Sequence, residues 1–221
     1  MMHITHLELL TNDLEATHAF YKSIPGLDVQ DRGDDFVTFA AGSTLLTFKH
    51  TTITRPIYHF AFTIPANKLY EALDSLKEKT EILTLPDGNP IADFAHWNAG
   101  AFYFYDNNGN ILEYIVRHSL DNAEALPFDS SRICCISEAG LVTDDVPALA
   151  GQLNRDYGLP LFTKQPPQDN FTVMGDDHGL LILVARHRHW FPTAVEAGVF
   201  PLKVTLRDEQ DKEHRIDHGR P

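Results

Sequence analysis

The stretch GAFYFYDNNGNILEYIVRH, residues 100–118, holds two alternating apolar runs on either side of DNNGN. Asn and Gly accept the positive φ angles of a tight turn, so this pattern is typical of a β-hairpin. Glu113 lies within the second run, between Leu112 and Tyr114. A lone carboxylate in the protein interior is too costly to leave unpaired. Glu113 therefore either faces solvent or has a partner in the interior.

The composition of the whole chain narrows the class of protein. The chain has 221 residues, 43% hydrophobic and 22% charged, as in ordinary globular proteins. Its formal net charge of −13 argues against nucleic acid or an anionic membrane as the main partner. No apolar run is long enough to cross a bilayer, and the first residues lack a secretory signal pattern. The two cysteines, Cys134 and Cys135, are adjacent and form no disulfide framework. We expect a cytoplasmic protein.

Three segments, beginning near positions 4, 56 and 132, share one order of expected elements: strand, helix, strand, strand, strand. The first and third also align in sequence, with ITHLELLTNDL (4–14) over ISEAGLVTDDV (136–146). Further on, FVTFAAGSTLL (36–46) lies over FTVMGDDHGLL (171–181) after a small insertion. These matches predict an internal repeat.

The repeat predicts how the chain is organised. We expect one domain of two modules at residues 1–118, a linker at 119–131, and a third module with one extra strand at 132–206. Residues 207–221 are expected to form a polar tail without order. The loop 85–100 is long enough to be a lid, and ARHRHWFPT (185–193) is interpreted as an aromatic plug or an interface.

Strand alternation assigns side chains to faces. In the first strand, His6 and Glu8 point away from the apolar side on which a helix must pack. His59 and Glu113 lie on the more polar sides of their own strands. We therefore expect these side chains to share the sheet face opposite the helices, where a curved sheet would form a cleft.

The motifs ITHLEL, YHFAF and YFYDNNGNILEY resemble those of the vicinal oxygen chelate superfamily. This superfamily contains glyoxalase I, extradiol ring-cleaving dioxygenases, and the fosfomycin and bleomycin resistance proteins. The resemblance covers residues 3–118 well and residues 133–206 more weakly. It implies an α+β fold in which repeated βαβββ modules form curved mixed sheets with helices on the outer face. It also implies that two modules together hold a divalent metal.

The metal ligands of this superfamily come from the first strand of each module and the last strand of the second. The resemblance thus implies His6, His59 and Glu113 as the ligands. Two imidazoles and one carboxylate with open coordination positions suit Fe(II), and Mn(II), Ni(II) or Zn(II) are also possible. In the third module Glu138 stands where the first module has His6. We therefore expect the third module to bind no metal.

The resemblance also suggests catalytic residues. Tyr103 lies ten residues before Glu113, as does a tyrosine shared by extradiol and fosfomycin enzymes. It would hydrogen-bond the oxygens of the substrate. Glu8 is a candidate base or a residue that orients a ligand, and His50 or His96 could serve as the acid–base histidine of extradiol enzymes.

Three functions follow from the resemblance. The leading one is a metal-dependent enzyme, most like an extradiol dioxygenase, that acts on a small molecule with vicinal oxygens. The alternatives are a metal-free small-molecule binding or resistance protein and a glyoxalase-type lyase or thiol transferase. Leu45 stands near the position of the fourth ligand of glyoxalase I, which counts against the lyase. We also expect a homodimer, because an unpaired third module needs a cover.

Overall fold

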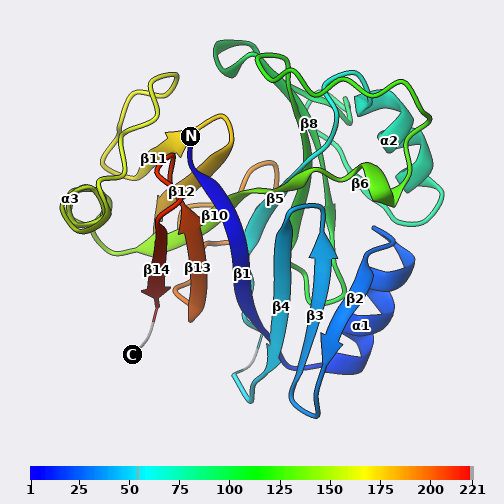
Figure 1. Ribbon diagram of the computed structural model, residues 1–221, viewed down its shortest axis with the longest axis horizontal. Coiled ribbons are helices and arrows are strands. Elements are labelled where there is room, and N and C mark those ends of the chain that lie inside the picture. Colours follow the sequence, from blue (N-terminus) through cyan, green and yellow to red (C-terminus); the bar gives the residue numbers. More distant parts are fainter. Residues whose placement is uncertain (54, 220–221) are drawn as a thin grey trace.

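The computed structural model describes residues 1–53 and 55–219, and its strands form two mixed sheets (Figure 1). The elements in chain order are β1 (His3–Thr11), α1 (Leu14–Ser23), β2 (Asp28–Arg32), β3 (Phe36–Ala41), β4 (Thr44–His50), β5 (His59–Thr63), α2 (Leu69–Lys77), β6 (Ile82–Leu83), β7 (Ala92–Phe94), η1 (Ala95–Trp97), β8 (Ala99–Tyr105), β9 (Ile111–Arg117), η2 (Ser130–Arg132), β10 (Cys135–Thr143), α3 (Val146–Tyr157), β11 (Phe171–Asp176), β12 (Gly179–Ala185), β13 (Leu202–Arg207) and β14 (Glu213–His218). This arrangement confirms the α+β class and the modules of the glyoxalase/dioxygenase fold. None of the described helices has the length and apolar character needed to cross a membrane.

Strand pairing joins the modules in an order that the sequence did not reveal. The first sheet has the order β14-β13-β1-β4-β3-β2, so the first module shares it with the C-terminal hairpin β13–β14. The second has the order β11-β12-β10-β5-β9-β8-β6, with β7 also paired to β8, so the second and third modules share it. The third module thus finds its partner inside the chain. The reason for expecting a homodimer no longer applies.

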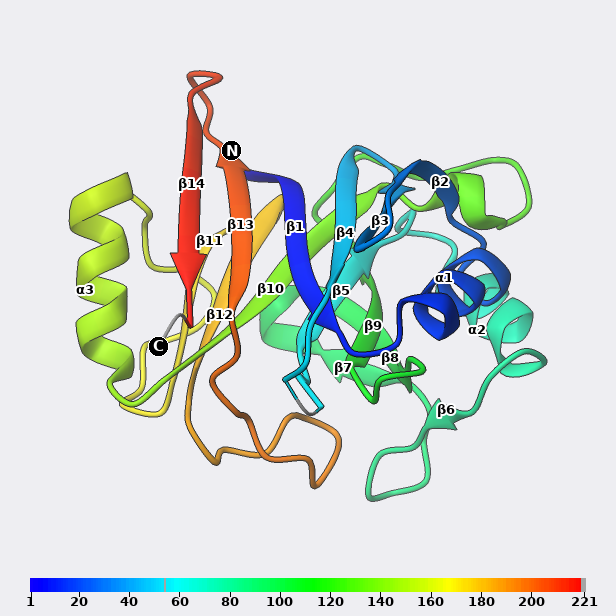
Figure 2. The same ribbon diagram turned by 90° about the horizontal axis from the view of Figure 1, so that it is seen from below.

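The local signals place the helices as expected. Asp13 and Asp145 cap α1 and α3, each accepting a 2.9 Å hydrogen bond from the backbone N–H of Ala16 or Ala148. Helix α3 ends at Gly158, whose φ of +68° suits the left-handed position after a helix. In Figures 1 and 2, α3 lies at one side of the molecule and α1 and α2 lie together at the other.

The main hydrophobic core draws side chains from both sheets and all three helices. Leu112 and Tyr114 of β9 belong to this core, whereas Ile111 and Ile115 belong to a second apolar cluster on the other face of the same sheet. This division is the one that alternation predicts. Glu113 shares the face of the second cluster, so the functional question concerns that face.

Two expectations about chain organisation are not met. The segment expected to be an unordered tail contains β14, which pairs antiparallel with β13 from Leu202↔His218 to Arg207↔Glu213. Positions 220 and 221 of that tail lie outside the described residues. The expected linker 119–131 does not separate two sheets, because β9 before it and β10 after it flank β5 in one sheet.

Candidate metal centre

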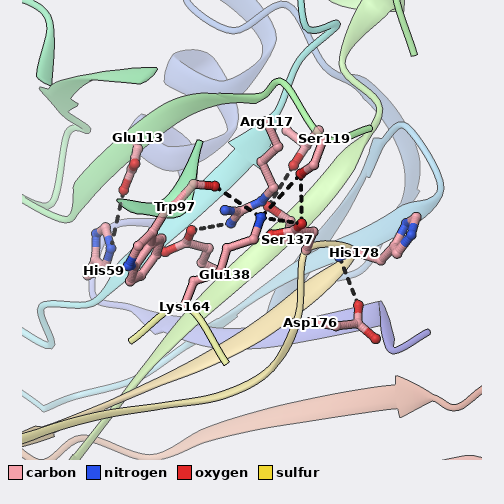
Figure 3. Close-up of polar contacts among 12 residues, drawn as sticks. His59, Trp97, Glu113, Arg117, Ser119, Ser137, Glu138, Lys164, Asp176 and His178 are labelled. Atoms are coloured by element: carbon pink, nitrogen blue, oxygen red, sulfur yellow. Dashed lines mark hydrogen bonds and ion pairs between the residues drawn. The ribbon is translucent and has the colours of Figure 1, made fainter. Parts of the chain in front are cut away.

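His59 and Glu113 lie on the neighbouring parallel strands β5 and β9. Nδ1 of His59 is 3.0 Å from the carbonyl oxygen of Ile111, which can only accept a hydrogen bond, so Nδ1 carries the proton. The lone pair of the neutral ring is then on Nε2, which lies 3.6 Å from Oε2 of Glu113 (Figure 3). Burial lowers the pKa of His59, which favours this neutral ring. The hydrogen bond to Ile111 thus orients Nε2 as a metal-ligating atom.

Glu138 on β10 completes the group. In the strand register Ala61 of β5 lies opposite Glu113 on one side and opposite Glu138 on the other. The small Ala61 side chain leaves space between the two carboxylates. One ligand atom from each of His59, Glu113 and Glu138 lies within 4.8 Å of the other two, and all three residues are buried. Their exposed fractions are 7%, 2% and 3%.

The charges of this group are not balanced by the chain alone. Burial raises the pKa of Glu113 well above its usual range, and the nearby Glu138 raises it further. Arg117 is fully buried and forms an ion pair with Glu138 through Nη2. Tyr103 lies opposite Glu113 in the register and hydrogen-bonds it. Two carboxylates therefore share one guanidinium, and Glu113 needs either a proton or a second cation.

The donor set fits a divalent cation. Two carboxylate oxygens and one neutral imidazole nitrogen are ligands that Fe(II), Mn(II) and Zn(II) accept. A cation between the carboxylates would also offset their mutual repulsion. The set carries one more negative charge than the expected two histidines and one glutamate. The buried group of His59, Glu113 and Glu138 could thus hold a divalent metal.

The structure does not bring His6 into this group. His6 lies on β1 in the other sheet, where its Nε2 is 2.8 Å from Oγ1 of Thr47. Glu8 lies on the same strand and forms ion pairs with Lys49 at 2.9 Å and Lys203 at 2.8 Å. The physical reason is strand pairing, because β10 rather than β1 occupies the edge of β5. The first strand of the third module, which we expected to supply no ligand, supplies the third residue of the buried group.

The group lies in the wall of a cavity of about 260 Å³. The other walls are mainly aromatic, and the cavity as a whole is lined by His59, Phe94, Trp97, Tyr103, Glu113, Glu138, Gln165, Phe171, Ile182, Arg188, Trp190 and Phe191. Phe94 and Trp97 come from the loop 85–100 that we expected to be a lid. Trp190 and Phe191 come from the segment interpreted as an aromatic plug or an interface.

Of the predicted catalytic residues, Tyr103 lines the cavity, and the two histidines do not. Tyr103 lines the cavity and is 4% exposed. His50, at the end of β4, and His96, in η1, are both exposed and do not line the cavity. Leu45 on β4 pairs with His6 on β1, so both lie in the other sheet from the group on β5, β9 and β10.

Lys164 joins three segments around the cavity. Its Nζ donates to the carbonyl oxygen of Trp97 at 3.1 Å, to Oγ of Ser119 at 3.3 Å and to Oδ2 of Asp177 at 2.6 Å (Figure 3). These bonds connect the ends of β8 and β9 with the turn between β11 and β12. The backbone beside Trp97 is thereby held against the third module.

Sequence reasoning missed Glu138, Arg117 and Arg188 as residues of this site. A signal for Glu138 was present, because the aligned repeats place it over His6. Arg117 shares the alternating face of Glu113 four residues earlier in β9, but nothing in the sequence paired it with Glu138. No pattern marked Arg188.

Comparison with protein-family models matches residues 3–114 to the glyoxalase/bleomycin resistance protein/dioxygenase superfamily. No curated protein matches the chain. A putative dioxygenase from Bacillus subtilis superimposes with a TM-score of 0.63 at 14% identity, over 99% of this chain and 86% of that one. A glyoxalase I mutant from Zea mays gives 0.53 at 13% identity, over 99% and 93%. At these identities the two structures show the same fold and leave the reaction open.

Proposed function

Because the chain belongs to the glyoxalase/bleomycin resistance protein/dioxygenase superfamily, we propose that it is a metal-dependent enzyme acting on a small molecule with two vicinal oxygens. The observation that carries the proposal is the buried group of His59, Glu113 and Glu138, with ligand atoms within 4.8 Å of one another. A divalent cation held there would supply Lewis acidity toward the oxygens of the substrate. Fe(II) is the favoured metal, with Mn(II), Ni(II) or Zn(II) as alternatives.

The other residues of the cavity have roles that follow from their contacts. The hydrogen bond to Ile111 orients the ring of His59, and Arg117 balances the charge of Glu138. Tyr103 holds Glu113 and also lines the cavity, so its hydroxyl can contact a bound substrate. The aromatic walls would give a bound substrate largely apolar surroundings.

Within the family, ring cleavage of the extradiol type is the reaction that we favour. The cavity of about 260 Å³ is just below the range of roughly 300–1,000 Å³ that drug-sized ligands occupy. Its aromatic side chains suit the faces of a flat ring. A catechol meets both conditions and carries two vicinal oxygens.

Metal analysis tests the proposal first. Protein purified without chelators is expected to hold a divalent metal in a one-to-one ratio, and His59→Ala and Glu138→Gln are expected to remove it. His6→Ala is the matched control, because His6 lies in the other sheet, and it is expected to leave the metal content unchanged. Wild-type protein with far less metal than chains, and no gain in stability on adding Fe(II), Mn(II), Ni(II) or Zn(II), would refute the proposal.

Oxygen consumption then identifies the reaction. Metal-loaded protein is expected to consume oxygen with at least one member of a catechol panel, and Tyr103→Phe is expected to slow this reaction. Metal binding without oxygen consumption would point to the lyase or transferase instead.

A metal-free binding protein is the second candidate, and the ion pair between Arg117 and Glu138 favours it. This pair gives Glu138 a cation from the chain itself. A protonated Glu113 hydrogen-bonded to Tyr103 would then complete a site without a net charge. Tight binding of a small aromatic molecule to protein that takes up no metal is the result that would support this candidate.

A further inference from the structure

Arg188 is the only lysine or arginine among the described residues that line the cavity. Its side chain is half-buried, and its guanidinium carbon lies 4.6 Å from the centre of the Phe171 ring, a stacked position that fixes the planar group. Among the described residues, its guanidinium makes a single hydrogen bond, which is long: 3.5 Å from Nη1 to the carbonyl oxygen of His189. Within the described chain it has no carboxylate partner. Arg188 is thus a cation that has lost part of its hydration without gaining an anion.

Arg186, two residues earlier, shows the contrast. It is exposed and makes two hydrogen bonds to Asp144, 2.6 Å from Nε and 2.8 Å from Nη2. The same short segment therefore presents one arginine with its anion already bound on the surface, and a second, Arg188, that lines the cavity and has no carboxylate partner among the described residues. A guanidinium without a carboxylate partner is suited to bind the carboxylate of a ligand.

Trp190 forms part of the cavity wall next to His59. It is 3% exposed, lines the cavity, and its ring centre lies 5.1 Å from that of His59. Its Nε1–H is buried and has no acceptor in the part of the chain that the structure describes. The indole ring of Trp190 therefore offers a bound molecule an apolar wall of the cavity.

The position of the charges sets the orientation of such a molecule. Glu113 and Glu138 are deeply buried and would repel an anionic group at their end of the cavity. Arg188 is less buried than they are, and it therefore lies toward the solvent side. An anionic group is favoured beside Arg188, and the opposite end of the molecule then faces the buried group.

We propose that the cavity selects a small aromatic carboxylate, with its ring between the aromatic walls and its carboxylate bound by Arg188. This inference rests on the proposed function, since it names the substrate class of the same cavity. It assigns Arg188 as the residue that distinguishes an acid from its neutral counterpart. The reacting end of the ring would face His59, Glu113 and Glu138.

Binding of benzoate and of benzamide tests the proposal, because the two ligands share a ring and differ in charge. Trp97 and Trp190 are the two tryptophans of the chain, and both line the cavity, so intrinsic fluorescence reports on it directly. Benzoate is expected to bind wild-type protein about 10- to 100-fold more tightly than benzamide, as a charge-assisted hydrogen bond implies. Arg188→Gln is expected to abolish this preference. Arg186→Gln, the matched control, is expected to retain it.

The proposal is overturned if wild-type protein binds the two ligands equally, a comparison that needs no variant to fold. It is also overturned if Arg188→Gln keeps the preference. The outcome is separable from that of the proposed function, because binding can be measured on chelator-treated protein. An acid preference that depends on Arg188 in protein that takes up no metal would leave this inference standing and refute the proposed enzyme. Metal uptake without any acid preference would support the proposed enzyme and overturn this inference.

Discussion

Replacing Arg117 with methionine removes the guanidinium that pairs with Glu138 and leaves an unbranched apolar side chain in the interior. Arg117 is fully buried and Glu138 is 3% exposed, so the variant keeps a carboxylate in the interior without its cation. Removal of one partner from a buried ion pair costs about 3–5 kcal/mol. Nε and Nη1 of Arg117 have no hydrogen-bond partner among the described residues. The substitution therefore breaks few other interactions, and we expect a loss of about 3 kcal/mol, the lower end of that range.

Urea unfolding of four proteins measures this quantity: the wild type, Arg117→Met, Glu138→Gln and the double variant. Because the double variant contains neither charge, its loss of unfolding free energy is expected to be smaller than the sum of the single losses by about 1–3 kcal/mol. Added Mn(II) is expected to stabilise Arg117→Met more than the wild type, because both oxygens of Glu138 are then available to a metal. If the double variant loses as much unfolding free energy as the two single variants together, the coupling between Arg117 and Glu138 is refuted.

Two further predictions concern stability away from the cavity. Burial alone would raise the pKa of Glu8, but hydrogen bonds from Lys203 and Lys49 lower it below the usual 4.5. The resulting stabilisation is present above pH 4.5 and is lost as the pH falls through the lowered pKa. Glu8→Gln is expected to lower the unfolding free energy by about 1 kcal/mol at neutral pH and not in acid, and a difference that persists in acid would contradict this. Tyr21→Phe removes the buried 2.7 Å hydrogen bond that Tyr21 donates to Asp106, and a loss of about 1–3 kcal/mol is expected in urea unfolding; no loss would show that the bond adds nothing.

The modules and the side-chain faces could be predicted from the sequence because local rules determine them. Alternation placed Glu113 on the other face of its strand from Leu112 and Tyr114, and the structure confirms this division. The resemblance placed His59 and Glu113 together, and the parallel pairing of β5 with β9 brings them within contact. Each of these features depends on residues within one strand or within one module.

The pairing between modules could not be predicted in the same way. A strand such as β5 has two edges, and β9 pairs with one of them. The alternation of side chains along β5 is the same whichever strand pairs with the other edge. Both β1 and β10 are first strands with similar sequences, so the pattern favoured neither. The structure pairs β5 with β10 and leaves β1 between β4 and β13. His6 was therefore expected at a position that Glu138 occupies.

The exchange of a histidine for Glu138 also explains a residue that the sequence left without a role. Two histidines and one glutamate carry a single negative charge, whereas His59, Glu113 and Glu138 carry two when both carboxyl groups are ionised. The additional charge is buried, so it needs a cation in reach. Arg117 lies on the same strand and face as Glu113 and contacts Glu138 (Figure 3). An arginine on the last strand of the second module and a glutamate on the first strand of the third therefore belong together. In the third module, the carboxylate at the first-strand position is thus accompanied by a buried cation from the neighbouring module.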